Sequence, residues 1–349
     1  MNHADAGTRH AREMDPADLA APRLDPPEPG TLLIDWRRAP FPIDWDRAFG
    51  RGGPLHLEVG FGDGRFTARR AHAESEGRFV GLEVSNVSVQ RALTRLRREG
   101  IHNVRLMKLG AEFAVRHLLP HAALSSVTVN FPDPWPKERH RDHRLLRPAF
   151  FSTLAARLVP GGEVRLATDH AEYLEFARTS AIDDGRYALV DAEPPPAVFE
   201  TKYATKWKGQ GKPLFYQVFR LERPAHDPLP PLERPTIMPH AFLTGTLPTT
   251  PAPRLEKLVV PYADGHVIVH EALRAVDDAE RWVFRVTVDE SDLVQQVLVV
   301  AQRREGGELI VRLERFGDPL VTPTTRGAVH AVTTWLAEVA GLRVTARNY

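Results

Sequence analysis

Short apolar runs alternate with helical stretches between residues 54 and 222, and this alternation constrains the fold more than any other feature. The runs typical of strands are 55–60, 79–84, 103–109, 126–131, 163–168, 187–191 and 213–221. Helical periodicity lies between them, for example over 86–99 and 147–159. Strands that alternate with helices form βαβ units with right-handed crossovers, which predicts an α/β fold with a mainly parallel sheet. Ligands of such folds bind beyond the carboxyl ends of the strands.

The rest of the 349-residue chain divides into three further segments. Residues 1–53 are rich in Pro, Asp and Arg and show little periodicity, so we expect an N-terminal arm that is partly disordered. Residues 223–254 are rich in proline, which predicts a linker. Residues 255–349 carry several strand patterns followed by a helical one, which predicts a small, separately folded α+β module of unknown role.

Composition excludes several classes of function. The chain has no cysteine, so disulfides, thiolate zinc sites and cysteine nucleophiles are excluded. No apolar run approaches the ~20 residues that cross a bilayer, and the N-terminus lacks the apolar core of a secretory signal. We therefore expect a cytoplasmic protein without a membrane partner. The net charge is only +1, so binding to nucleic acid needs local basic patches.

A glycine-rich loop follows the first strand pattern. Glu58 precedes Gly60, Gly62 and Gly64, whose lack of a Cβ allows sharp turns and close approach of a ligand. The spacing differs from the G-x-G-x-x-G that seats a pyrophosphate, and an acid before the glycines suits a ligand with an ammonium group, such as S-adenosylmethionine. Glu83 ends the second strand, where a carboxylate can accept hydrogen bonds from both ribose hydroxyls. The alternative is a glycine-rich turn beside an ordinary surface acid.

The fourth strand pattern leads into a loop with three prolines, over residues 130–136. Proline cannot donate a strand hydrogen bond and stiffens the chain. The stiff loop is expected to present Asn130, Asp133 and Trp135 where the transferable methyl group should lie. The alternative is a rigid turn in which Trp135 is a hydrophobic anchor.

A basic segment, residues 137–147, follows this loop. It begins with Lys137 and Arg139 and contains five cations against two acids. Its place beside the predicted active site favours contact with RNA phosphates, whereas a charge run elsewhere would be a solvated helix face. His140 and His143 lack a third ligand in cationic surroundings, so we predict no metal site.

A second basic segment, residues 201–213, contains four lysines and no acid. Tyr203 and Trp207 are interleaved with the lysines, one of which is Lys202. Cations together with aromatic rings suit phosphate contact and base stacking. The alternative is a flexible hairpin loop before the last strand.

Taken in order, these motifs resemble the bacterial tRNA (guanine-N7-)-methyltransferases. The matching segments are ExGFGxG, GLEVS, NFPDPWPKERHRxHRL, GGEVRLATDHxEY and TKY, within roughly 31–222. The resemblance implies a Rossmann-like class I methyltransferase fold over 54–222, with a seven-stranded, mostly parallel sheet and helices on both faces. It also implies transfer of a methyl group from S-adenosylmethionine to a guanine N7 of tRNA, commonly position 46 in the variable loop.

The resemblance implies roles for particular residues, beside those argued from the loops. The cofactor residues are Glu58, Gly60, Gly62, Glu83, Gly110, Asn130 and Asp133, of which Asp133 is also catalytic. The substrate residues are Lys137, Arg139, Asp169, Thr201, Lys202, Tyr203 and Ala204. Gly110 and Ala204 stand where the family usually has acidic residues. Backbone groups at 110–111 and the carboxylate of Glu112 are the candidates to replace the first of these acids.

Guanine N7 carries a lone pair and no proton, so its attack on a sulfonium methyl group needs no general base. Asp133 or Asp169 would stabilise the positive charge that grows on the ring, or orient the base through its N1–H and exocyclic amine. Two alternatives compete with this function. The chain could methylate another RNA or a protein, or it could bind tRNA with weak or lost catalysis. The sequence does not determine the oligomeric state.

Overall fold

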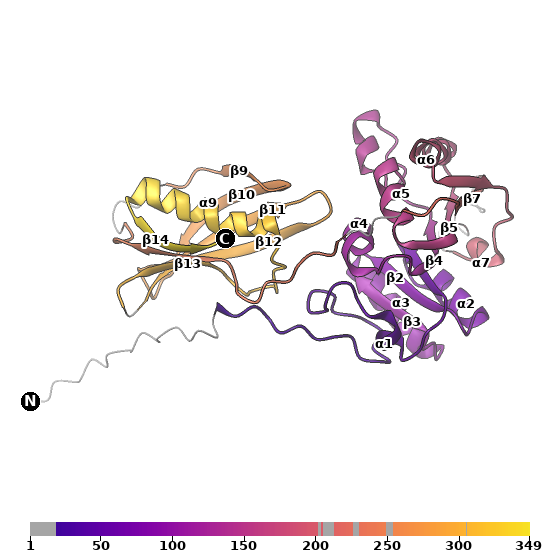
Figure 1. The fold of residues 1–349 in the computed structure, drawn as a ribbon, viewed down its shortest axis with the longest axis horizontal. Helices are drawn as coiled ribbons and strands as arrows, with labels where there is room; N and C mark the ends of the chain where they lie inside the picture. The colour runs from indigo at the N-terminus through magenta and orange to yellow at the C-terminus, as the bar shows by residue number, and fades with distance from the viewer. Residues whose placement is uncertain (1–18, 202–203, 205–212, 226–229, 249–253, 305) are drawn as a thin grey trace, which may run out of the picture. The chain divides into compact units, whose positions relative to one another are not determined.

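The computed structural model describes residues 19–349 except 202–203, 205–212, 226–229, 249–253 and 305 (Figure 1). These residues form two compact units. The first unit comprises Leu24–Glu233, and the second joins the described residues before Leu24 to Arg234–Tyr349. Both units therefore extend beyond the segments 54–222 and 255–349 that the sequence suggested.

The first unit is built on a seven-stranded sheet with the order β3-β2-β1-β4-β5-β7-β6. Its strands are β1 (Leu55–Val59), β2 (Arg78–Glu83), β3 (Val104–Lys108), β4 (Leu124–Asn130), β5 (Leu158–Thr168), β6 (Tyr187–Val190) and β7 (Phe215–Leu221). Strands β1 to β5 run parallel to one another, and β7 runs antiparallel to β5 and β6. The predicted α/β fold with a mostly parallel, seven-stranded sheet is thereby confirmed.

The helices of this unit alternate with the strands along the chain, as the colours of Figure 1 show. They are α1 (Trp45–Phe49), α2 (Arg65–Ala73), α3 (Asn86–Arg98), α4 (Ala111–Phe113), α5 (Pro148–Ala155), α6 (Ala171–Asp184) and α7 (Pro196–Phe199), with a π-helical turn at Ala114–Leu118 and a 3-10 helix at Glu138–His143. Side chains of α2 and α3 share a hydrophobic core with residues of β2 and β3. The helix expected over 147–159 is shorter, because Leu158 already pairs with Leu124 as part of β5.

Residues 24–53, expected to belong to a loose arm, pack onto the first unit instead. Ile34, Trp36, Ile43 and Trp45 are all buried. The amide of Ile34 also donates a hydrogen bond to the carbonyl of Leu106 in β3, at 2.9 Å. Apart from the short helix α1, the segment is held by scattered apolar residues, and such residues leave no periodic signal in the sequence.

The second unit is an antiparallel sheet with one long helix, α9 (Pro323–Ala340). The strand order is β14-β8-β13-β12-β11-β10-β9. The strands are β8 (His240–Thr244), β9 (Leu258–Tyr262), β10 (Gly265–Arg274), β11 (Arg281–Asp289), β12 (Val294–Arg303), β13 (Leu309–Leu313) and β14 (Arg343–Asn348). The predicted C-terminal α+β module is therefore present. Strand β8 lies inside the segment 223–254, whose proline content predicted a linker. Strands β8 and β14 are the parts of the module that the sequence did not predict.

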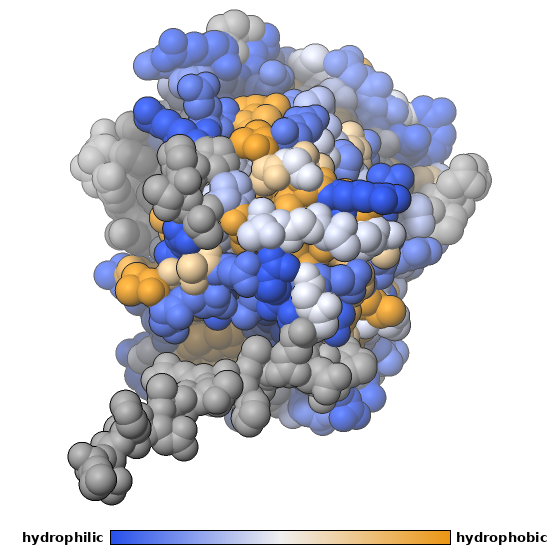
Figure 2. Space-filling model, turned by 90° about the vertical axis from the view of Figure 1, so that its left-hand side faces the viewer, coloured by the Kyte–Doolittle hydropathy of each residue, from blue (hydrophilic) through white to orange (hydrophobic). Residues whose placement is uncertain are grey.

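The core of the second unit lies between α9 and one face of its sheet. Val329, Val332 and Leu336 of the helix pack against strand residues such as Phe284 and Val299. One face of the molecule is seen in Figure 2, where hydrophilic residues predominate and hydrophobic ones form small, separate patches. Among the described residues, no helix combines the length and the apolar character needed to cross a membrane.

Candidate cofactor and substrate site

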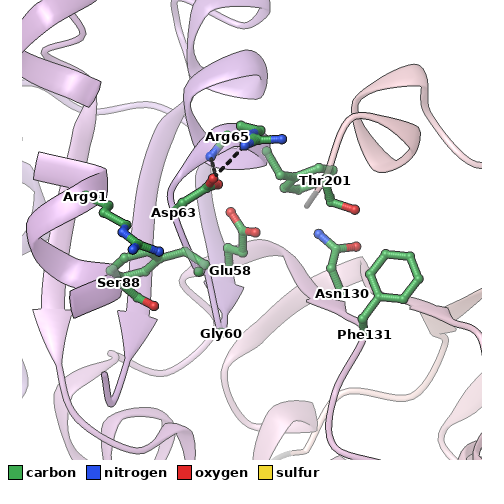
Figure 3. A pocket seen from close by; sticks show the side chains of 12 residues that line it. Glu58, Gly60, Asp63, Arg65, Ser88, Arg91, Asn130, Phe131 and Thr201 are labelled. Carbon is green, nitrogen blue, oxygen red and sulfur yellow. Dashed lines mark hydrogen bonds and ion pairs between the residues drawn. The ribbon is translucent and has the colours of Figure 1, made fainter. Parts of the chain in front are cut away.

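A pocket opens at the carboxyl ends of β1 and β4 (Figure 3). Its lining consists of Glu58, Gly60, Phe61, Gly62, Asp63, Arg65, Phe66, Ser88, Arg91, Asn130, Phe131 and Thr201. Strand order reverses between β1 and β4, and this is where doubly wound sheets bind their ligands. The structure thus brings five of the predicted site residues together: Glu58, Gly60, Gly62, Asn130 and Thr201.

The three glycines of the loop have different tasks. All three have positive φ angles, of 72° at Gly60, 57° at Gly62 and 75° at Gly64. A Cβ atom built on Gly60 or Gly62 would meet no atom within 4 Å, whereas one on Gly64 would lie 2.8 Å from the Cβ of Ala92 in α3. The first two glycines therefore leave room for a ligand, and the third allows the loop to pack against α3.

The carboxylate of Glu58 is buried at the floor of the pocket. Burial raises its pKa to about 7, although a hydrogen bond from the hydroxyl of Thr67 and the nearby guanidinium of Arg70 both lower it. A buried carboxylate is stabilised when a cation comes close. The methionine part of S-adenosylmethionine carries such a cation, its ammonium group, so Glu58 fits the predicted ligand.

Asn130 ends β4, which neighbours β1, and its amide nitrogen points toward the Glu58 carboxylate in Figure 3. Both polar atoms of this amide are buried, and its approach to the carboxylate lowers the pKa of Glu58 without completing a hydrogen bond of normal geometry. Buried polar groups are nearly always hydrogen-bonded, so an amide in this state fits a site that a polar ligand completes. Glu58 and Asn130 together offer a carboxylate, a donor and an acceptor for the amino-acid part of the cofactor.

Glu83 does not line the pocket but holds the glycine loop in place, and its binding of ribose stays a prediction. Its Oε2 atom accepts a hydrogen bond from the amide of Gly62 at 3.0 Å. Its Oε1 atom accepts bonds from the amides of Val84 and Ser85, at 2.9 and 3.0 Å. Oε2 keeps a free lone pair, because an ionised carboxylate has about four acceptor positions.

Gly110 lies outside the pocket lining, at the N-cap of α4, where its backbone is extended and its Cα faces open space. The side chain of Glu112, one of two candidates to replace the missing acid, binds Arg147. The carboxylate of Glu112 is thus engaged by a cation, and the backbone groups at 110–111 are the remaining candidate.

Asp133 is exposed on the loop that follows β4 and does not line the pocket. On either side of it, Phe131 and Trp135 have positive φ angles of 51° and 43°. Such angles are unfavourable for bulky residues and mark a strained loop. The ring of Trp135 packs against the rings of His140 and His143, with centroids 5.7 and 5.0 Å away.

Three predicted substrate residues follow β4 and β5. Lys137 and Arg139 are exposed beside residues 131–136, the loop that carries Asp133 (the Asp133 loop). Asp169 is half-buried after β5, the strand next to β4. Lys202 and Tyr203 lie outside the described residues. Among the described residues, no group of three His, Asp or Glu side chains is arranged to hold a metal ion.

Thr201 and Ala204 form a turn after α7. The hydroxyl of Thr201 donates to the carbonyl of Val198 at 2.9 Å and accepts from the amide of Ala204 at 3.1 Å. Ala204 itself is buried, with 5% of its surface exposed. An acid in place of Ala204 would therefore be buried in this conformation. The Thr201 hydroxyl stabilises its own turn, and Thr201 itself lines the pocket.

Sequence reasoning missed four polar residues of the pocket lining, which are Asp63, Arg65, Ser88 and Arg91. Asp63 forms an ion pair with Arg65 at 3.0 Å, and both lie at the start of α2. Ser88 and Arg91 come from the first turns of α3, three residues apart. Residues three apart share a helix face, and this spacing after the second strand was the available signal.

Comparison with known proteins agrees with this geometry. Residues 52–217 match a family model described as a putative methyltransferase. The chain is 43% identical over 313 residues to the tRNA (guanine-N(7)-)-methyltransferase of Thermus thermophilus, covering 90% of this chain and 98% of that protein. It is 43% identical over 304 residues to the protein of that name from Deinococcus radiodurans, covering 85% and 92%. For that from Thermotoga maritima the identity is 32% over 295 residues, covering 84% and 92%. Each match is longer than the first unit, so the second unit also has a counterpart in these relatives.

Proposed function

The chain belongs to the tRNA (guanine-N(7)-)-methyltransferase family, and on this premise we propose that it transfers a methyl group from S-adenosylmethionine to N7 of a guanine in tRNA. We propose the variable-loop guanine at position 46 as the acceptor. The observation that carries the proposal is the pairing of a buried Glu58 with a buried Asn130 amide that lacks a hydrogen bond of normal geometry, in a pocket at the strand-order reversal. Because tRNA is the substrate, we place the reaction in the cytoplasm.

The residues of the pocket bind and orient the cofactor, which supplies an electrophilic methyl group on a sulfonium. Glu58 and Asn130 bind the amino-acid part, Gly60 and Gly62 leave space for it, and Glu83 accepts hydrogen bonds from the ribose. The backbone groups at 110–111 would face the adenine. The methyl group would then be directed toward the loop that carries Asp133.

Most of the catalysis in this proposal is positioning, because guanine N7 has a free lone pair and needs no base. Alignment of nucleophile, methyl group and leaving sulfur can contribute up to about 7–11 kcal/mol. Asp133 and Asp169 follow neighbouring strands, β4 and β5, so both carboxylates can approach one base. There they stabilise the cationic product ring and accept bonds from the guanine N1–H and amine. Lys137, Arg139 and the segment from Thr201 through Lys202, Tyr203 and Ala204 bind the RNA around that base.

The test is methyl transfer from labelled S-adenosylmethionine to unmodified tRNA transcripts, followed by identification and mapping of the product nucleoside. We expect 7-methylguanosine in the variable loop and no label in a transcript in which guanine 46 is replaced by adenine. Label in another nucleotide, another RNA or a protein would move the assignment to a different acceptor. Cofactor binding and tRNA binding without any transfer would identify a binding protein instead.

A further inference from the structure

Three arginines of the first unit are buried, and the guanidinium group of each donates hydrogen bonds to backbone carbonyls. Arg105, Arg144 and Arg157 each expose 2% or less of their surface. Arg105 donates to the carbonyl of Ala48, and Arg157 donates to that of Val115, both away from the pocket lining. Arg144 alone of the three reaches a loop that carries a predicted site residue.

The contacts of Arg144 join two parts of the predicted substrate site. Its Nε atom donates to the carbonyl of Pro134 at 2.9 Å, and its Nη2 atom donates to that of Trp135 at 3.2 Å. The same guanidinium lies 4.9 Å from the ring centre of Phe176 and 3.7 Å from a carboxylate oxygen of Glu172. Both of these residues belong to α6, which begins immediately after Asp169 and His170. One buried side chain therefore contacts the Asp133 loop and the helix behind Asp169.

The Asp133 loop needs such an external donor. Prolines at 132, 134 and 136 supply no N–H groups, so the loop cannot form its own network of backbone hydrogen bonds. Positive φ angles at Phe131 and Trp135 strain it further. A strained loop persists only when its surroundings hold it, and Arg144 provides two of the bonds that do so.

The arrangement is poorly suited to stability alone. The Nη1 atom of Arg144 is buried without a hydrogen-bond partner. The acidic neighbour, Glu172, is largely exposed at 59% of its side chain and lies beyond hydrogen-bond distance. A buried cation with an unsatisfied donor and a distant counter-charge contributes little net stability.

We propose that Arg144 is a positioning residue for methyl transfer, which holds the turn of Asp133, Pro134 and Trp135 in register with α6 and so with Asp169. The inference rests on the proposed function, in which these two carboxylates face the guanine. Arg144 acts through backbone carbonyls and does not touch the substrate. Its loss should therefore slow the chemical step more than it weakens cofactor binding.

The kinetic test compares Arg144→Met and Arg144→Lys with Arg157→Met. Arg157 is a similarly buried arginine that donates to backbone carbonyls elsewhere in the first unit. At saturating substrates and below each melting temperature, we expect Arg144→Met to lower kcat about 30-fold or more, since a small misplacement costs up to about 100-fold. The Kd for S-adenosylmethionine should stay within about twofold, because Glu58 and Asn130 are unchanged. Arg144→Lys keeps the positive charge and a donor nitrogen but loses the planar fork, so it should recover part of the rate. Arg157→Met should melt earlier but keep its kcat.

A spectroscopic test reads the loop directly. In protein labelled with 5-fluorotryptophan, the resonance of Trp135 is assigned with Trp135→Phe. We expect Arg144→Lys to shift this resonance and Arg157→Met to leave it in place. Should Arg144→Met fail to fold, Arg144→Lys carries both tests.

A kcat within twofold of the wild type for Arg144→Lys and Arg144→Met, or an unmoved Trp135 resonance, would overturn the inference while the proposed function stands. An inactive wild-type protein would instead overturn the proposed function, and the fluorine resonance would still decide whether Arg144 holds the loop. A parallel loss of kcat in Arg157→Met would reduce Arg144 to a general structural role.

Discussion

The carboxylate of Glu83 accepts a hydrogen bond from the backbone amide of Gly62, with 3.0 Å between Oε2 and the nitrogen. The two residues belong to different βα units, so this bond ties the glycine loop after β1 to the end of β2. The same carboxylate is the one predicted to bind the ribose of the cofactor. We therefore expect loop geometry and cofactor binding to depend on one side chain.

Replacing Glu83 with glutamine should weaken cofactor binding. The glutamine amide presents one acceptor oxygen and a donor group to three backbone N–H donors, so at least one bond is lost. A hydrogen bond to a charged group contributes about 1.5–3 kcal/mol, which predicts a Kd for S-adenosylmethionine raised about tenfold or more in calorimetric titration. Glu76→Gln is the control, since that side chain is almost fully exposed. Equal affinities for the two variants would contradict the role of Glu83.

Cofactor binding should strengthen as the pH rises through 7, because of Glu58. Burial raises its pKa from 4.5 to about 7, so the free protein still holds part of its proton at neutral pH. A cationic ligand favours the ionised form. The apparent Kd should therefore fall about tenfold between roughly pH 6 and pH 8, with release of a proton on binding. Titrations in buffers of different ionisation enthalpy measure that proton. Glu58→Gln is the control. Any dependence of its Kd on pH reports the titration of the ligand itself. The same dependence in both proteins would exclude Glu58 as the cause.

The same shift predicts how stability depends on pH. Between pH 4.5 and about 7 the folded protein keeps a proton on Glu58 that the unfolded chain has lost. The folded state therefore binds more protons, and the free energy of unfolding contributed by Glu58 falls as the pH rises through this window. Urea unfolding of the wild type and Glu58→Gln across that range should show the wild type losing stability relative to the variant. A constant difference would contradict the shifted pKa.

Asp133→Asn should abolish most turnover while leaving the fold intact. Asp133 is exposed, so its replacement should change the free energy of unfolding by no more than about 0.5 kcal/mol. Removing a charge that stabilises the developing cation should lower kcat about 100-fold. The measurement is single-turnover methyl transfer to tRNA. Asp142→Asn is the matched control, because Asp142 is another exposed acid and lies in the segment that follows the Asp133 loop. Retained turnover in a stable Asp133→Asn protein would remove this residue from the mechanism.

Two glycines of one loop should respond differently to alanine. At Gly62 a Cβ meets open space, so Gly62→Ala should destabilise only through its positive φ, by about 1–2 kcal/mol, and mainly impede the ligand. At Gly64 the same φ penalty is joined by a contact of 2.8 Å with Ala92, and overpacking typically costs a further 1–3 kcal/mol or so. Urea unfolding and cofactor titration of both variants check this. A larger loss of stability at Gly62 would show that the loop packs differently.

The strands of the first unit could be predicted from sequence because parallel strands covered on both faces are continuous apolar runs. Strand β2, for example, spans Arg78–Glu83 where the pattern indicated 79–84. Strand β8 was missed, since His240–Thr244 is short and lies among prolines, and its place is set by pairing with β13 and β14. Such pairing joins residues far apart in the chain and leaves no local pattern.

The sequence by itself determined the chemistry that depends on neighbouring residues: the acid before the glycines, the acid that ends β2, and the stiff loop around Asp133. Only the tertiary structure decided which side chains are buried and which are bound by other residues. It buries Ala204, engages Glu112 with Arg147 and turns Arg144 back onto the Asp133 loop. The physical reason is that burial and hydrogen-bond partners are set by contacts between distant segments, whereas spacing and composition report only what a segment can do locally.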